Sequence, residues 1–78
     1  MEFLVFIVID RFDENLNGHI QDHLIGVFTS LAEARFQIEE SELNNFRWLG
    51  KTRCKFTKNN LAHEIVIEKI IMNNLMAQ

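Results

Sequence analysis

The sequence predicts an α+β fold, in which a four-stranded antiparallel sheet in the order β-β-α-β-β carries one helix on one face. Two observations lead to this fold class. Short apolar runs rich in β-branched residues lie toward both ends of the chain, and a segment with helical periodicity lies between them. The 78 residues are expected to form a single domain, residues 1–78, because 47% hydrophobic and 24% charged residues are typical of a globular chain.

The first two strands are predicted from apolar runs on either side of a polar segment. Residues 3–9 are continuously apolar, which predicts a strand buried on both faces because the run is too short for most helices. Residues 10–23 are polar and include Asn17 and Gly18, a pair that favours a tight turn. Residues 24–28 then predict an antiparallel partner, joined by a long hairpin or an ordered loop.

The helix is predicted from a cap and an apolar stripe. Ser30 and Glu33 have the spacing of a capping box, in which the serine oxygen accepts from the third backbone amide of the helix. Leu31, Ala34 and Ile38 follow at positions that share one helical side. The helix is expected to end near residue 43, before two asparagines.

The second half of the chain predicts a loop and two more strands. Residues 46–50 favour a turn or short loop, and residues 53–58 alternate weakly, as a half-exposed strand does. Residues 64–72 are dense in β-branched residues and predict a strand, although some apolar positions between residues 61 and 75 also fit one helical side. A frayed or short helical tail is expected after this strand.

A single helix leaves one face of the sheet uncovered, whereas residues 3–9 are apolar on both faces. Exposing several large apolar side chains costs several kcal/mol, at roughly 25 cal/mol per Å². We therefore expect a homodimer to cover the second face, with the alternative that residues 73–78 fold back over it.

A resemblance starts from residues 24–30, Leu-Ile-Gly-Val-Phe-Thr-Ser, followed by Glu33 and Ala34 at the beginning of a helix. This pattern resembles a group of small uncharacterised phage and bacterial proteins, and the similarity extends over residues 3–38. The resemblance implies the strand–strand–helix–strand–strand order and a phage-encoded accessory protein. It carries no site residues over, because the group has no established activity.

The chain shows no catalytic signature. Cys54 is its one cysteine, so an internal disulfide is excluded, and we interpret it as a small buried hydrophobe. The first residues lack the positive flank and length of a signal peptide or membrane span, so the expected location is cytoplasmic, the host cytoplasm if the protein is phage-encoded. We expect no enzyme activity, no cofactor and no membrane contact.

Two polar groups invite a metal-site interpretation. Residues 13–24 resemble a calcium loop, but Leu24 stands where that loop needs a bidentate glutamate, so an asparagine–glycine hairpin is favoured. His19, Asp22, His23 and His63 offer zinc ligands, yet four residues separate the first and third of these along the chain. We interpret the histidines as solvated loop residues and predict no metal.

Charge is unevenly distributed and defines two candidate surfaces. Residues 1–45 carry nine acidic and two basic side chains, whereas residues 46–78 carry six basic and two acidic ones. Bases and aromatic residues interleave in a candidate nucleic-acid surface comprising Arg47, Trp48, Lys51, Arg53, Lys55 and Lys58, together with Phe56. A candidate protein-binding surface is acidic and comprises Glu33, Glu39, Glu40, Glu42, Asp13 and Glu14, with Asp10 nearby.

These features favour a small protein-binding accessory module, such as a phage-encoded inhibitor that occludes a surface of a host or antiviral-defence protein. Its small size, its two-signed charge and the absence of catalytic residues support this hypothesis. A nucleic-acid-binding protein that uses residues 47–58 is the first alternative, and a structural subunit of a larger assembly is the second.

Overall fold

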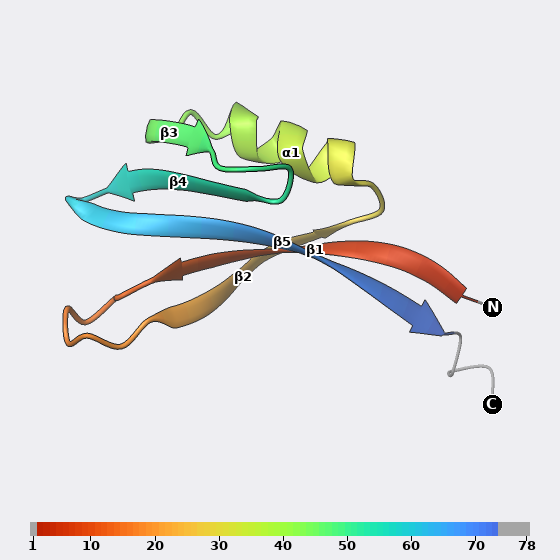
Figure 1. The fold of residues 1–78 in the computed structure, drawn as a ribbon, viewed down its shortest axis with the longest axis horizontal. Helices are drawn as coiled ribbons and strands as arrows, with labels where there is room; N and C mark the ends of the chain where they lie inside the picture. The colour runs from red at the N-terminus through yellow and green to blue at the C-terminus, as the bar shows by residue number, and fades with distance from the viewer. Residues whose placement is uncertain (1, 74–78) are drawn as a thin grey trace.

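The computed structural model describes residues 2–73 and contains one antiparallel sheet with one helix (Figure 1). The predicted α+β class, the antiparallel sheet and the single helix are confirmed. The elements are β1 (Glu2–Phe12), β2 (Gln21–Phe28), α1 (Leu31–Glu40), β3 (Asn44–Trp48), β4 (Arg53–Lys58) and β5 (Leu61–Asn73).

The sheet has the strand order β2-β1-β5-β4-β3, so the first and last strands of the chain pair at its centre. Phe3 pairs with Met72 at one end of this central pair and Arg11 with Glu64 at the other. The β1–β2 register shifts between Val8 and Ile9, as it does at a β-bulge. β2 and β3 are the two edge strands.

The sheet has five strands rather than the predicted four, because β3 covers residues 44–48 and so includes the first part of the turn or loop expected over residues 46–50. Asn45 adopts a positive φ of 54°, and the register with β4 shifts there, so the sequence pattern of this strand is broken. The helix also ends at Glu40 rather than near residue 43, and Glu42 has a positive φ of 52°. The strand predicted over residues 64–72 is confirmed, whereas the predicted tail lies outside the described residues.

The core lies between α1 and the face of the sheet that α1 covers. Ala34 and Ile38 of the helix pack against a buried cluster that comprises Val8, Cys54, Phe56, Ile65 and Ile67. The predicted cap is present, since the Ser30 hydroxyl accepts from the Glu33 backbone N–H at 3.1 Å. The helix therefore begins at the predicted cap and buries the predicted apolar stripe.

The opposite face, which we call the open face, carries both apolar and charged side chains. Directly opposite residues of neighbouring strands share a face, so the register places Ile9, Val66 and Leu24 together there. The ends of β1 and β5 extend past both neighbouring strands (Figure 1). We call this two-stranded extension the arm; its exposed apolar side chains are Phe3, Leu4, Ile71 and Met72.

Candidate functional site

The outer side of α1 carries a large exposed aromatic side chain. Phe36 lies two residues from both Ala34 and Ile38, which puts it on the opposite side of the helix at 100° per residue. Its exposed fraction is 55%. Glu33 and Glu40 lie one helical turn before and after it, so the phenyl ring stands between two exposed carboxylates.

The helix is held in this orientation by contacts with β3 and the turn after it. The Trp48 indole Nε1 donates to Oε2 of Glu39 at 3.2 Å, and the Arg35 guanidinium lies 4.1 Å from the centre of the same ring system. Arg35 also donates to the Lys51 backbone carbonyl at 3.0 Å. Arg35 and Glu39 are one helical turn apart, so these contacts tie one flank of the helix to β3 and to the turn after it.

The predicted acidic residues do not form one surface. Glu33, Glu39 and Glu40 lie on α1, and Glu42 follows it, whereas Asp13 and Glu14 lie in the loop between β1 and β2. Figure 1 places that loop at the far end of β1 and β2, away from the helix. The Asp13 carboxylate oxygens accept from the backbone N–H groups of Asn17 and Gly18, so Asp13 shapes its own loop.

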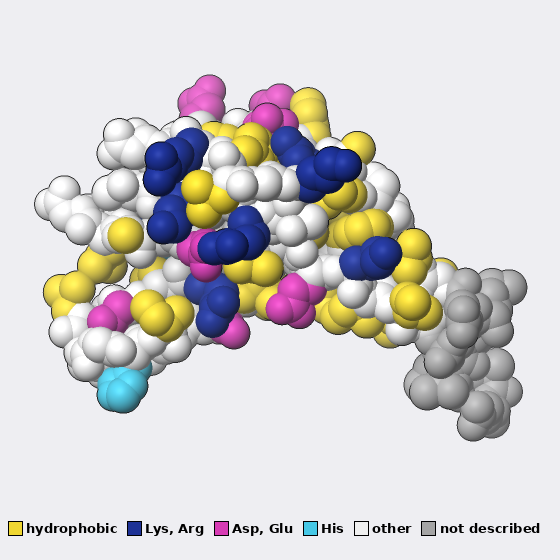
Figure 2. Space-filling view, in the orientation of Figure 1, with side chains coloured by type: hydrophobic (Ala, Val, Ile, Leu, Met, Phe, Trp, Pro, Cys, Tyr) yellow, Lys and Arg dark blue, Asp and Glu magenta, His cyan; other side chains and the backbone are white. Residues whose placement is uncertain are grey.

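A row of charged residues crosses the open face, with one residue from each of the five strands. The register places neighbouring members of this row directly opposite one another; in sheet order they are Asp22, Arg11, Glu64, Lys55 and Arg47. We call this set the charged row. In Figure 2, lysine and arginine side chains gather where Figure 1 places β3, β4 and β5.

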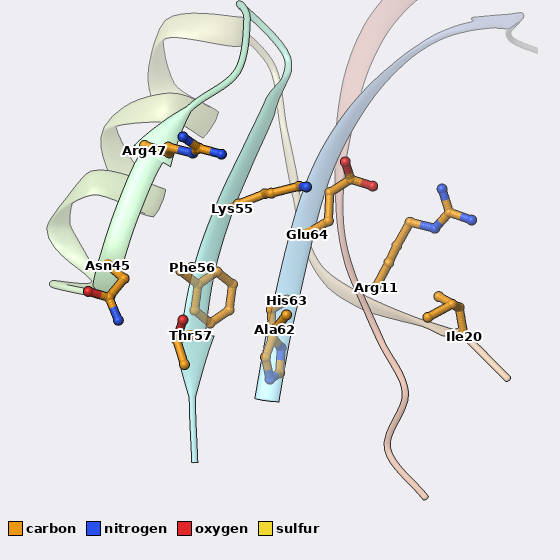
Figure 3. Close-up of a pocket in the computed structure, with 10 residues that line it drawn as sticks. All are labelled: Arg11, Ile20, Asn45, Arg47, Lys55, Phe56, Thr57, Ala62, His63 and Glu64. Carbon is orange, nitrogen blue, oxygen red and sulfur yellow. The ribbon is translucent and has the colours of Figure 1, made fainter. Parts of the chain in front are cut away.

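Positive charge dominates one end of the charged row. Arg11 Nε lies 2.9 Å from Oδ1 of Asp22, and Arg53 donates to Glu64. Arg47 and Lys55 form no ion pair with any residue between positions 2 and 73. Both line an open depression of about 500 Å³, to which Arg11 also contributes, as Figure 3 shows.

The residues predicted to bind nucleic acid do not all lie on one face of the sheet. Arg47, Arg53 and Lys55 share the open face, as expected for alternate residues of β3 and β4. Lys51 lies in the turn between these strands, and Lys58 lies at the far end of β4. Trp48 and Phe56 pack into the core side instead, so they are not available on the open face for base stacking.

The interpretation of all three histidines as solvated loop residues is wrong for His63 and for His23, because both lie in strands. His63 lies in β5 with an exposed fraction of 5%, and its ring stacks between Phe12 and Phe56. His23 stacks on the other side of Phe12, which extends the stack to four rings. Among residues 2–73, no three or more His, Cys, Asp or Glu side chains are placed to hold a metal ion.

Cys54 is fully buried, and burial raises the pKa of its thiol to about 11. A thiol that keeps its proton at neutral pH is a poor nucleophile. No helix within the described part of the chain is long and apolar enough to cross a membrane. The chain matches no protein-family model, no curated protein and no solved structure.

Proposed function

We propose that the chain is a small protein-binding module that occupies a surface of its partner through the outer side of α1. The observation that carries the proposal is Phe36, a half-exposed aromatic side chain on a rigidly held helix, with Glu33 and Glu40 beside it. Aromatic residues that fill a pocket on the partner contribute much of the energy of many interfaces. The adjoining carboxylates favour a partner whose pocket has a basic rim.

This surface suits a protein that inhibits by occlusion, such as a phage-encoded inhibitor of a host or antiviral-defence protein. A short helix presented by a sheet offers a preformed shape, so little conformational entropy is lost when it binds. Glu39 has a second role, because it accepts from Trp48 and supports the helix. We therefore assign the contact to Phe36, Glu33 and Glu40, and Glu39 to positioning.

The test is a comparison of tagged variants in a bacterial lysate treated with nuclease. We expect the wild-type chain to retain a stoichiometric protein at moderate salt, and Phe36→Ala to lose it. Leu16→Ala is the matched control, since Leu16 is an exposed apolar residue in the loop between β1 and β2. Retention of the same protein by Phe36→Ala would contradict the assignment.

A charge test separates the carboxylates from the ring. Glu33→Lys with Glu40→Lys should weaken binding more at low salt than at high salt, since screening reduces long-range attraction. Glu14→Lys with Glu68→Lys is the control for net charge, because it replaces two exposed glutamates that lie in the distant loop and on β5. An equal effect of the two changes would show that overall charge, rather than this helix side, governs binding.

Nucleic-acid binding remains a second candidate because Arg47 and Lys55 lie directly opposite one another and neither forms an ion pair with a described residue, although Glu64 lies opposite Lys55. Two cations beside a depression suit phosphate oxygens. Without aromatic side chains from β3 and β4 on this face, binding would depend on the phosphate backbone. Affinity for single-stranded DNA should then fall steeply with salt and be lost in Arg47→Glu with Lys55→Glu.

A further inference from the structure

The two edges of the sheet differ in how well they are protected against pairing with another strand. β3 is five residues long, contains a positive-φ residue, and carries Arg47. β2 is eight residues long and carries no lysine, arginine or proline. Natural proteins block free edges with short strands, irregular backbone and positive charge. β3 has all three features, whereas β2 has only the register shift with β1 beside Ile25, so β2 is the less protected edge.

The side chains of β2 are also unusually apolar for an edge strand. Leu24, Ile25 and Val27 have exposed fractions of 66%, 55% and 55%. The register places Leu24 and Val27 on the open face, opposite Ile9 and Ile7 of β1. Ile25 instead lines a groove on the face that α1 covers, so apolar surface is exposed on both faces of β2.

We propose that β2 pairs antiparallel with β2 of a second copy of this chain, which joins the two sheets into one continuous sheet. A two-fold axis perpendicular to the sheet makes the two copies of β2 run antiparallel, so a second copy offers an edge of the right length and direction. β2 is an edge strand of the sheet with β1 as its one hydrogen-bonded neighbour among the described strands. In Figure 1 its first part lies outermost, whereas its last part passes behind β1 and β5 toward α1, which packs against β2 and β1 on one face of the sheet.

The charge pattern favours a second copy as the occupant. Residues 24–28 are uncharged, and a two-fold axis close to this segment brings it beside its own copy, so apolar side chains of the two copies gather there on both sides of the register shift at Ile25. Asp22 falls outside this central segment and is already paired with Arg11. Two chains of net charge −3 thus meet where neither contributes an unpaired charge.

The size of the contact sets the expected affinity class. β2 has eight residues, and the molecule is 17 Å thick in its shortest direction. At roughly 3.4 Å per residue, the shared edge is about 27 Å long and covers on the order of 450 Å² in projection. Specific interfaces bury about 800 Å² of accessible surface per partner, so this is a reversible dimer at the small end of the range.

The proposal differs from a dimer that covers the open face or uses the arm. A two-fold axis perpendicular to the sheet leaves the open face free and puts both copies of α1 on the same side. The proposal does not depend on what α1 binds. In such a dimer, a binding surface on α1 is present twice, once on each copy, and both copies of this surface lie on the same side of the joined sheet.

Sedimentation equilibrium of the untagged chain from about 1 to 100 μM tests the proposal. We expect a monomer–dimer equilibrium for the wild type and for Ile71→Lys, and a monomer for Val27→Lys throughout this range. Ile71 is the matched control because it is an exposed apolar residue in the arm. A wild type that stays monomeric, or dissociation by Ile71→Lys but not by Val27→Lys, would overturn the proposal.

Amide hydrogen exchange of the wild type makes the test independent of how well Val27→Lys folds. Alternate N–H groups of β2 point away from β1 and have no strand partner among residues 2–73. We expect these amides to exchange at least several-fold more slowly at 100-fold higher protein concentration. Exchange that is independent of concentration in a dimer would place the contact elsewhere and reject the β2 pairing.

Discussion

The Nδ1 atom of His63 lies 3.0 Å from Oδ1 and 3.1 Å from Oδ2 of Asp10, although the two residues are far apart in the sequence. Because a carboxylate only accepts hydrogen bonds, Nδ1 carries the hydrogen. His63 is buried, and Asp10 supplies its partner from the neighbouring strand. The end of the sheet away from the arm therefore depends on a polar pair enclosed by aromatic rings.

Removing the acceptor should destabilise the protein. Asp10→Ala leaves the buried His63 N–H unpaired, which costs about 1–3 kcal/mol in the free energy of unfolding. Asp10→Asn keeps an amide oxygen at the same place and should cost less. Urea unfolding measures both, with Asp22→Ala as the control because its ion pair with Arg11 is exposed and contributes about 0–1 kcal/mol. Equal losses for Asp10→Ala and Asp22→Ala would show that His63 does not need this acceptor.

The two sides of α1 should respond differently to truncation. Ile38→Ala removes a buried side chain from the core and should lower the free energy of unfolding by about 2–5 kcal/mol. Phe36→Ala changes an exposed residue and should stay within about 0.5 kcal/mol. The fluorescence of Trp48 in urea reports both, since it is the only tryptophan and contacts the helix. A large loss in Phe36→Ala would mean that its ring supports the fold and would remove it as a binding residue.

Acid should weaken the protein through Glu64. The hydrogen bond from Arg53 is the main cause of the lowered pKa of this carboxyl, and Lys55 and Arg11 add to it. Because the folded-state pKa lies below the ordinary 4.5, the stabilisation is complete above that pH and is lost as pH falls through the folded pKa. Glu64→Gln should therefore show a smaller loss of stability from neutral pH to about pH 3 than the wild type. Glu40→Gln, on the exposed side of α1, should follow the wild type; identical curves for all three proteins would remove Glu64 as the source.

Cys54 should be protected from thiol reagents. Burial raises its pKa to about 11, so the folded state keeps the proton to higher pH than the unfolded state, whose pKa is near 9. Stability should then fall as pH rises above 9. At pH 8, alkylation of Cys54 should be fast in urea and slow in buffer. In buffer, its rate should be set by how often the protein unfolds. Fast alkylation in buffer would mean that the residues packed around Cys54 separate locally, without global unfolding.

The elements with a strong local pattern were predictable from the sequence. The β-branched density of residues 64–72 indicates a strand because side-chain packing on a sheet favours such residues. Ser30 and the apolar stripe that ends at Ile38 indicate where the helix begins and which side it buries. The same stripe places Phe36 on the solvent side, so this exposed residue was also recognisable from spacing alone.

The elements that depend on distant partners were not predictable. β3 is short and has a broken register, and its position depends on β4 and on the contact between Trp48 and Glu39. His63 resembles a solvated histidine until Asp10 and the two phenylalanine rings are placed beside it. The charged row arises from the register of five strands, which no single segment encodes.

The central position of β1 and β5 has a consequence for how the chain folds. Asn59 and Asn60, both at positive φ, join β4 and β5 by a two-residue turn, so that hairpin closes a short loop. The pairing of β1 with β5 instead closes a loop of nearly the whole chain, which is slow because distant contacts carry a large entropic cost. During synthesis β1 is made before β5, its partner at the centre of the sheet. The apolar β1 therefore lacks this partner until β5 has been made. A chaperone that binds β1 during this interval should increase the yield of native protein.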